Sequence, residues 1–119
     1  MTSQLVIKER SFSSGVILDL QGDVTKTSED QLLHSRNWSD ETSAGIRVVF
    51  NFTDVPYINS AGIAILIRIA QAAEKSGIML YAYGVSNHYQ KMFRLIGLNE
   101  FIMIFPDEYS LMQRLGASE

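Results

Sequence analysis

The sequence of 119 residues contains no cysteine. This absence excludes disulfide bonds and thiolate chemistry, and it suits a protein of the reducing cytoplasm. Histidine is also scarce, because His34 and His88 are the only two, and they are too few for a His-rich metal site. We therefore expect neither a metal ion nor a cofactor, and a fold held by its hydrophobic core alone.

Positive charge is neither abundant nor clustered. The ten lysine and arginine residues are scattered along the chain and are outnumbered by thirteen acidic residues, which gives a net charge of −3. No basic stripe is present for phosphate backbones, so direct binding of nucleic acid is not expected. Neither glycine-rich pattern for phosphate binding, G-x-x-x-x-G-K or G-x-G-x-x-G, is present, which argues against nucleotide catalysis.

Long hydrophobic runs are missing as well. The most apolar segment, residues 61–70, contains Arg68 and is far shorter than the roughly 20 residues that cross a bilayer. The first four residues lack the basic and apolar regions of a signal peptide. We expect a cytoplasmic protein without direct membrane insertion.

Proline occurs only at Pro56 and Pro106, and the sequence has no internal repeat or low-complexity tract. These features argue against a linker and a second domain. The N-terminal Met1 favours a protein that stands alone.

The segments that are present predict an α/β fold. Two of them predict an N-terminal β-hairpin, namely Leu5–Glu9 and Val16–Leu20 around the turn Ser11–Gly15. Three later apolar runs predict strands covered by helices: Ile46–Phe52, Ile78–Tyr83 and Phe101–Phe105. Alternation of strands and helices after the hairpin predicts a mixed, largely parallel sheet with right-handed crossovers.

About four helices are expected between and after these strands. Ser28, with Gln31 three residues later, predicts a capping box and a helix to about Asn37. A second helix begins near Ser60. Ser86 predicts the N-cap of a third helix that ends at Gly97. The apolar spacing places these residues of the third and fourth helices on the core side: Tyr89, Met92, Phe93, Ile96, Tyr109, Leu111, Met112 and Leu115.

The junction Ile58–Gly62, at the start of the second helix, places a single hydroxyl, Ser60, among small residues. Helical periodicity turns one side of this helix to water: Ser60, Ala64, Arg68, Gln71 and Lys75. The opposite side is apolar and wide: Gly62, Ile63, Ile65, Leu66, Ile69, Ala70 and Ala73. The rim residues Ile63, Ile65 and Ile67 are therefore expected to be partly exposed, which favours a protein partner.

Plain structural explanations exist for each of these residues. Asn59 or Ser60 is a good N-cap, Gly62 suits close packing of a helix start against a sheet, and Gly22–Asp23 is a typical turn after a strand. Ser60 could also be a hydrolase nucleophile with His88 as its base. The sequence Ile58–Gly62 lacks the first glycine of the Gly-x-Ser-x-Gly elbow, however, so we do not expect an enzyme.

Five segments, in order along the chain, match one family. Leu18–Val24 is similar to its second strand with a Gly-acidic-apolar ending, and Val48–Val55 to its central strand. Ile58–Ile63 is similar to its Asp-Ser-x-Gly-apolar signature, Gly77–Leu80 to its next strand, and Met92–Leu98 to its Leu-x-x-x-Gly-Leu segment. The chain thus resembles the STAS domain of bacterial anti-sigma factor antagonists. The resemblance implies a single STAS domain, residues 1–119, with its core at about 4–115.

The resemblance also implies a function. Ser60 corresponds to the serine that a GHKL-type serine kinase phosphorylates, and that kinase is often itself the anti-sigma factor; a phosphatase reverses the modification. The unphosphorylated form binds the anti-sigma factor and frees a sigma factor, as a monomer or weak dimer. The implied partner surface consists of Gly22, Asp23, Thr25, Asn59, Ser60, Ala61, Gly62, Ile63 and Ala64.

Two positions depart from the family pattern. Asn59 replaces the usual Asp before the serine, and Thr25 replaces a common Asp after the Gly-acidic-apolar ending. Both changes lie on the surface that, by the resemblance, the kinase or the anti-sigma factor recognises. The alternative is a STAS scaffold without a serine switch, such as a stressosome-like subunit or the accessory subunit of a membrane lipid transporter.

Overall fold

Five strands form one sheet in the computed structural model, which describes residues 4–116. They are β1 (Val6–Phe12), β2 (Gly15–Gln21), β3 (Arg47–Asp54), β4 (Met79–Tyr83) and β5 (Ile102–Phe105). The strands lie side by side in chain order, β1 antiparallel to β2 and every later pair parallel. The predicted hairpin and the mixed, largely parallel sheet are both confirmed.

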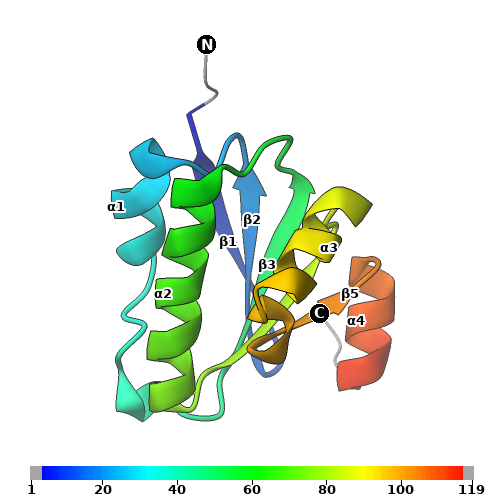
Figure 1. Ribbon diagram of the computed structural model, residues 1–119. Coiled ribbons are helices and arrows are strands. Elements are labelled where there is room, and N and C mark those ends of the chain that lie inside the picture. Colours follow the sequence, from blue (N-terminus) through cyan, green and yellow to red (C-terminus); the bar gives the residue numbers. More distant parts are fainter. Residues whose placement is uncertain (1–3, 117–119) are drawn as a thin grey trace.

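Among the described residues, four α-helices cover the two faces of this sheet (Figure 1). Helices α1 (Glu29–Leu33), α2 (Ser60–Ser76) and α3 (Asn87–Leu95) pack on one face, and α4 (Glu108–Leu115) packs on the other. The same range contains three short 3-10 turns in its connecting segments: η1 (Lys26–Ser28), η2 (Glu41–Ser43) and η3 (Leu98–Glu100). Ser86 caps α3 by accepting a hydrogen bond from the Tyr89 N–H, and Gly97 follows its end with a φ of 79°, both as predicted.

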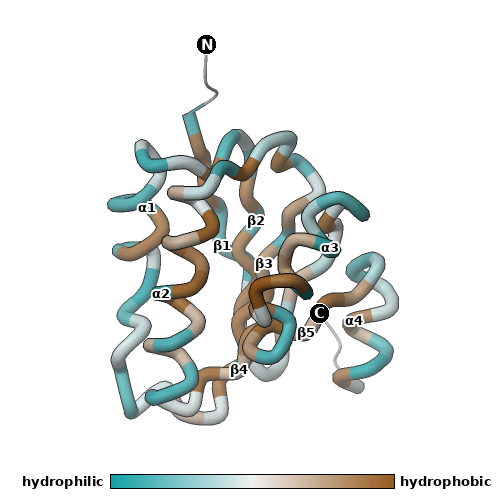
Figure 2. The backbone as a smooth tube through the Cα atoms, in the orientation of Figure 1, coloured by the Kyte–Doolittle hydropathy of each residue, from teal (hydrophilic) through white to brown (hydrophobic). Residues whose placement is uncertain are grey.

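Alternating strand residues build two hydrophobic layers. The larger layer joins Leu18, Phe50 and Leu80 of the sheet to Leu66 of α2 and Phe93 of α3. The smaller layer, under α4, consists of Phe12, Ile17, Val49, Tyr81, Tyr83 and Leu111. In Figure 2, hydrophobic and hydrophilic stretches alternate along α2, as expected of a helix with one buried side. Central strands with both faces buried read as near-continuous apolar runs, which is why the sequence predicted them well.

The first helix is shorter than predicted, and its start is different. The Ser28 hydroxyl donates to the Asp23 carbonyl at 2.7 Å, so it does not cap the helix, and Gln31 donates to the Leu5 carbonyl at 2.7 Å. The helix ends at Leu33 rather than near Asn37. At the end of the helix, where the chain turns away, the Leu32 carbonyl accepts hydrogen bonds from the Ser35 hydroxyl and the Trp38 side chain.

Four further residues differ from the prediction in their exposure, two because of neighbouring helices and two because of their position at a helix end. Ile63 and Ile65, expected at a partly exposed rim, are buried in the main core, because α1 lies beside one flank of α2 and α3 extends the apolar layer on the other. Only Ile67 stays partly exposed. Ile96 and Tyr109, expected in the core, are 45% and 73% exposed, since each lies at an end of a short helix.

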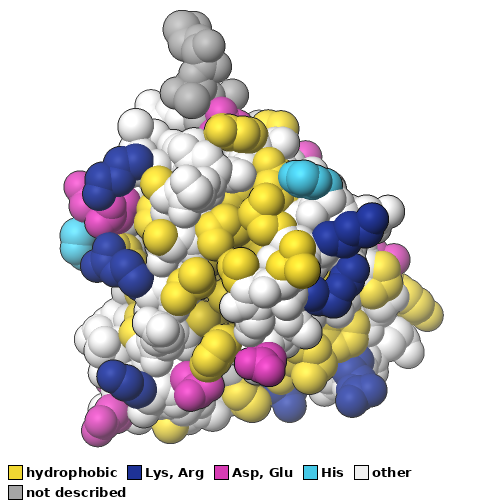
Figure 3. All heavy atoms as spheres, in the orientation of Figure 1, with side chains coloured by type: hydrophobic (Ala, Val, Ile, Leu, Met, Phe, Trp, Pro, Cys, Tyr) yellow, Lys and Arg dark blue, Asp and Glu magenta, His cyan; other side chains and the backbone are white. Residues whose placement is uncertain are grey.

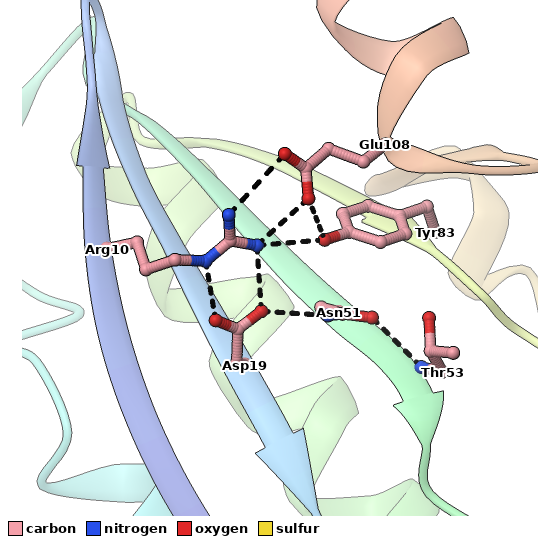
Figure 4. Close-up of polar contacts among 6 residues, drawn as sticks. All are labelled: Arg10, Asp19, Asn51, Thr53, Tyr83 and Glu108. Carbon is pink, nitrogen blue, oxygen red and sulfur yellow. Dashed lines mark hydrogen bonds and ion pairs between the residues drawn. The ribbon is translucent and has the colours of Figure 1, made fainter. Parts of the chain in front are cut away.

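A polar network joins β1, β2, β3 and β4 to the start of α4 (Figure 4). Arg10 donates two hydrogen bonds to the carboxylate of Asp19, at 2.6 and 3.0 Å, and a third to Glu108 at 2.9 Å. Tyr83 donates to Glu108 at 2.8 Å, and Asn51 donates to Asp19 at 2.8 Å. The hydrogen bonds from Arg10 hold the pKa of Asp19 below its usual value.

Asp19→Asn is expected to destabilise the protein near neutral pH and to matter less in acid. Because the pKa of Asp19 is lower in the folded than in the unfolded state, its carboxylate stabilises the fold above the unfolded value of about 3.9. That contribution is lost as the pH falls through the folded value. Urea unfolding at about pH 7 and about pH 2.5 should therefore show a difference between variant and wild type that narrows in acid. An equal difference at both pH values would contradict this role.

Candidate functional site

The loops that follow β2 and β3 are joined at one end of the sheet. Val24 and Ile58 form an isolated parallel bridge, with the Val24 N–H donating to the Tyr57 carbonyl at 3.0 Å. The Asn59 N–H donates back to the Val24 carbonyl at 3.2 Å. This backbone pairing fixes the point at which α2 begins and places its first residue, Ser60, on the exposed surface.

Asn59, not Ser60, is the N-cap of α2. Its backbone is extended, with φ −97° and ψ −178°, and its side-chain oxygen accepts a hydrogen bond from the Gly62 N–H at 2.9 Å. Its carbonyl accepts from the Ile63 N–H, also at 2.9 Å. Within residues 4–116 the hydroxyl of Ser60 takes part in no hydrogen bond, so it is available to react with or contact another molecule.

Asn59→Ala is expected to lower the free energy of unfolding by about 1 kcal/mol, because the Gly62 N–H loses its side-chain acceptor. Asn59→Asp should instead keep that bond and add about 0.5 kcal/mol, since a negative charge interacts well with the helix N-terminus. Chemical denaturation of both variants measures the two changes. A variant Asn59→Ala as stable as wild type would show that this cap does not stabilise α2.

Gly62 allows α2 to approach the loop after β2. A Cβ atom on Gly62 would lie 2.1 Å from the Val24 carbonyl oxygen, far inside contact distance. Gly22 has a φ of 118°, and its N–H donates to the Asp54 carbonyl at 3.1 Å. Both glycines thus serve the close approach of backbone segments, as the structural explanation of Gly62 proposed.

The structure brings the nine predicted partner-binding residues to one end of the sheet but exposes only some of them. Ser60 and Ala64 are exposed, while Asn59 and Ala61 are partly buried. The other five are buried: Gly22, Asp23, Thr25, Gly62 and Ile63. Asp23 and Thr25 are 8% and 4% exposed, so their side chains shape this surface from beneath, and their part in partner binding stays a prediction.

Two tyrosines that were not among the predicted residues also lie close to the start of α2. Tyr57 is exposed in the loop before α2. The hydroxyl oxygen of Tyr89, on α3, accepts a hydrogen bond from the Ile58 N–H at 2.9 Å and so ties α3 to the loop that carries Ser60. Its position on the apolar side of α3 was predictable, but its polar contact, made across a loop, had no signal in the sequence.

His88 does not form a nucleophile–base pair with Ser60 in the described part of the chain. Its ring stacks edge-on against Tyr89, with centroids 4.9 Å apart, and no hydrogen bond connects it to Ser60. Among residues 4–116, no group of three or more acidic or histidine side chains is placed to hold a metal ion. No helix in the same range has the length and hydrophobicity needed to cross a membrane.

A cluster of ion pairs links α2 to α1 and η1. Glu29 of α1 forms ion pairs with Lys26 and with Arg68 of α2, the latter at 3.0 Å. The pKa of Glu29 is lowered mainly by the hydrogen bond from Lys26 and also by the one from Arg68. Arg68 lies two turns after Ser60 on the same side of the helix, as the helical pattern predicted, and this side is exposed throughout.

Comparison with known proteins relates this geometry to one family. The sequence model of the STAS domain matches residues 6–111. An anti-sigma factor antagonist from Mycobacterium paratuberculosis is similar in structure, with a TM-score of 0.69, 12% identity and 93% of each chain covered. The anti-sigma factor antagonist SpoIIAA in its unphosphorylated form gives a TM-score of 0.64 at 15% identity, covering 96% of this chain and 100% of SpoIIAA.

The Bacillus cell fate determinant SpoIIAA in its phosphorylated form gives a TM-score of 0.66 at 16% identity, covering 92% of this chain and 99% of SpoIIAA. No curated protein matches the sequence at a significant level. At these identities the structural likeness establishes a shared fold.

Proposed function

The chain belongs to the STAS domain family, and on that basis we propose that it is an anti-sigma factor antagonist controlled by phosphorylation of Ser60. Unphosphorylated, it binds an anti-sigma factor that is also a GHKL-type serine kinase, and a sigma factor is released. Phosphorylation breaks the complex, and a phosphatase restores binding. The observation that carries the proposal is the exposed hydroxyl of Ser60, placed at the first residue of α2 and not used in its cap.

The physical chemistry of phosphoserine supports such a switch. A phosphate on Ser60 adds about −1.5 to −2 charges and strong hydrogen-bond acceptors. The N-terminus of α2 carries partial positive charge and unpaired amides, so the isolated domain tolerates this group. A partner surface that packs closely against Ser60, Ala61 and Ala64 does not, unless it supplies cations of its own. Phosphorylation can therefore remove binding while the fold persists.

In this proposal, the protein is a binding module of the cytoplasm rather than an enzyme, and it acts as a monomer or weak dimer. Asn59 keeps the helix cap without the carboxylate usual at this position. Kinase recognition in this chain therefore relies on the exposed loop, which includes Tyr57, and on the start of α2 rather than on an acidic residue before the serine.

Phosphorylation by purified GHKL-type kinases of the host tests this function. We expect one of them, with ATP, to transfer one phosphate to wild-type protein, located at Ser60 by mass spectrometry, and none to Ser60→Ala. Ser86→Ala is the matched control and should be phosphorylated like wild type, because Ser86 is also an exposed serine at the start of a helix. Phosphate on another residue, or on none with every kinase tried, would contradict the proposal.

A further inference from the structure

The loop that leads into α2 is held from two sides. On one side it pairs with the loop after β2, because the Val24 N–H donates to the Tyr57 carbonyl and the Asn59 N–H donates to the Val24 carbonyl. The Ile58 N–H, between these two contacts, donates instead to the hydroxyl oxygen of Tyr89 at 2.9 Å. This contact reaches the loop from α3, which begins at the same end of the sheet as α2 (Figure 1). The start of α2 is thus fixed by a loop and by a neighbouring helix.

The position of Tyr89 is itself well fixed. Its backbone N–H donates to the hydroxyl oxygen of Ser86, the N-cap of α3, at 3.3 Å. The next side chain, Gln90, donates to the Val85 carbonyl at 2.9 Å and ties the same turn to the end of β4. The Tyr89 ring is partly buried against the main core, and in Figure 3 hydrophobic side chains gather between α2 and α3. The hydroxyl therefore presents an acceptor of fixed position to the loop.

The Ile58 N–H depends on this acceptor. Ile58 is only 4% exposed, and within residues 4–116 its N–H makes no other hydrogen bond. A buried backbone donor without a partner is unfavourable, so loss of the Tyr89 hydroxyl favours movement of the loop towards water. Ser60 follows Ile58 by two residues and moves with the loop.

Asn59 makes the position of the backbone more important. It is neutral, and its side-chain oxygen accepts a hydrogen bond from the Gly62 N–H at 2.9 Å. The residue before Ser60 therefore offers a kinase no carboxylate with which to orient the hydroxyl. The direction in which this hydroxyl leaves the surface is set by the loop, and group transfer is sensitive to a displacement of about 1 Å.

We propose that Tyr89 is a positioning residue for Ser60: its hydroxyl holds the Ile58 peptide and so sets the orientation in which Ser60 meets the kinase. The inference rests on the proposed function and adds to it a residue of α3. Tyr89 touches no reacting atom and acts through the loop. Loss of its hydroxyl should slow phosphoryl transfer more than it weakens kinase binding, because the exposed surface at the start of α2 is unchanged.

Tyr89→Phe and Tyr83→Phe test the proposal as a matched pair. Each removes a tyrosine hydroxyl with a hydrogen bond of similar length, 2.9 Å to Ile58 and 2.8 Å to Glu108, but Tyr83 faces α4 on the opposite side of the sheet. With a kinase that phosphorylates wild type, kcat at Ser60 should fall about fivefold in Tyr89→Phe, with KM within about twofold of wild type. Both constants should be unchanged in Tyr83→Phe. Thermal unfolding shows that both variants are folded at the assay temperature.

Hydrogen exchange of the unmodified protein gives a second measurement that needs no kinase. Exchange of the Ile58 amide is compared with that of Phe50, at the centre of the sheet, so that a general loss of stability cancels. Relative to Phe50, Ile58 should exchange at least about fivefold faster in Tyr89→Phe than in wild type, and at the wild-type rate in Tyr83→Phe.

The outcomes separate this inference from the proposed function. Equal exchange ratios in the two variants, or equal values of kcat, would overturn the positioning role while leaving the Ser60 switch standing. An equal fall of kcat in both variants would reflect a loss of stability alone and would also overturn it. If no kinase modifies wild type, the proposed function fails, and the exchange ratio by itself decides whether Tyr89 holds the loop.

Discussion

Ser60→Asp is expected to weaken binding to the anti-sigma factor by more than 100-fold and to leave the circular dichroism spectrum unchanged. The carboxylate brings a negative charge to an interface that otherwise packs against small residues, at a cost of about 3 kcal/mol, and about 1.4 kcal/mol corresponds to tenfold in affinity. The fold is unaffected because Ser60 is exposed and an acidic residue is favourable in the first turn of a helix. Isothermal titration with the purified anti-sigma factor measures the loss.

Two controls frame this experiment. Ser60→Ala should bind like wild type, because it removes the hydroxyl without adding charge. Ser13→Asp adds the same charge at an exposed position in the β1–β2 turn, at the opposite end of the sheet, and should also bind like wild type. If Ser60→Asp binds as tightly as Ser13→Asp, charge at this position does not control the complex.

Gly62→Ala is expected to destabilise the protein by about 2–3 kcal/mol, although alanine is a better helix former than glycine. The added Cβ would lie 2.1 Å from the carbonyl oxygen of Val24, and that oxygen already accepts the Asn59 N–H. Relief of the clash must move the start of α2, and Ser60 with it. Thermal unfolding should show a loss of about 10 °C in the melting temperature.

The matched control for this substitution is Gly45→Ala. Gly45 has a φ of 88°, but a Cβ there would meet no atom within 4 Å, so only backbone strain of about 1–2 kcal/mol is expected. If Gly62→Ala were no less stable than wild type, the close approach of α2 to the loop after β2 would not be a constraint on this fold.

Much of the sheet was predictable because its central strands are buried on both faces. Val48 and Phe50 point to one layer and Val49 to the other, which leaves an unbroken apolar run in the sequence. The length of α1 was not predictable. The helix ends where the side chains of Ser35 and Trp38 both donate to the Leu32 carbonyl, and such contacts leave no periodic signal.

The start of α2 was also predictable, but the arrangement around it was not. Asn59 and Ser60 are both good capping residues, and the structure shows which one caps through the extended backbone of Asn59 and its side-chain bond to the Gly62 N–H. The burial of Thr25 depends on the pairing of two loops through Val24 and Ile58. Pairing between loops is set by tertiary packing, so residue type and spacing do not reveal it.

An affinity pull-down from the native host, with wild-type, Ser60→Ala and Ser60→Asp proteins as baits, tests the phosphorylation switch most directly. Mass spectrometry identifies the captured proteins and the modification of Ser60. We expect a GHKL-type kinase or anti-sigma factor retained by wild type and Ser60→Ala but lost with Ser60→Asp. Capture of the same partners by all three baits, with Ser60 never phosphorylated, would contradict the switch and indicate a constitutive scaffold.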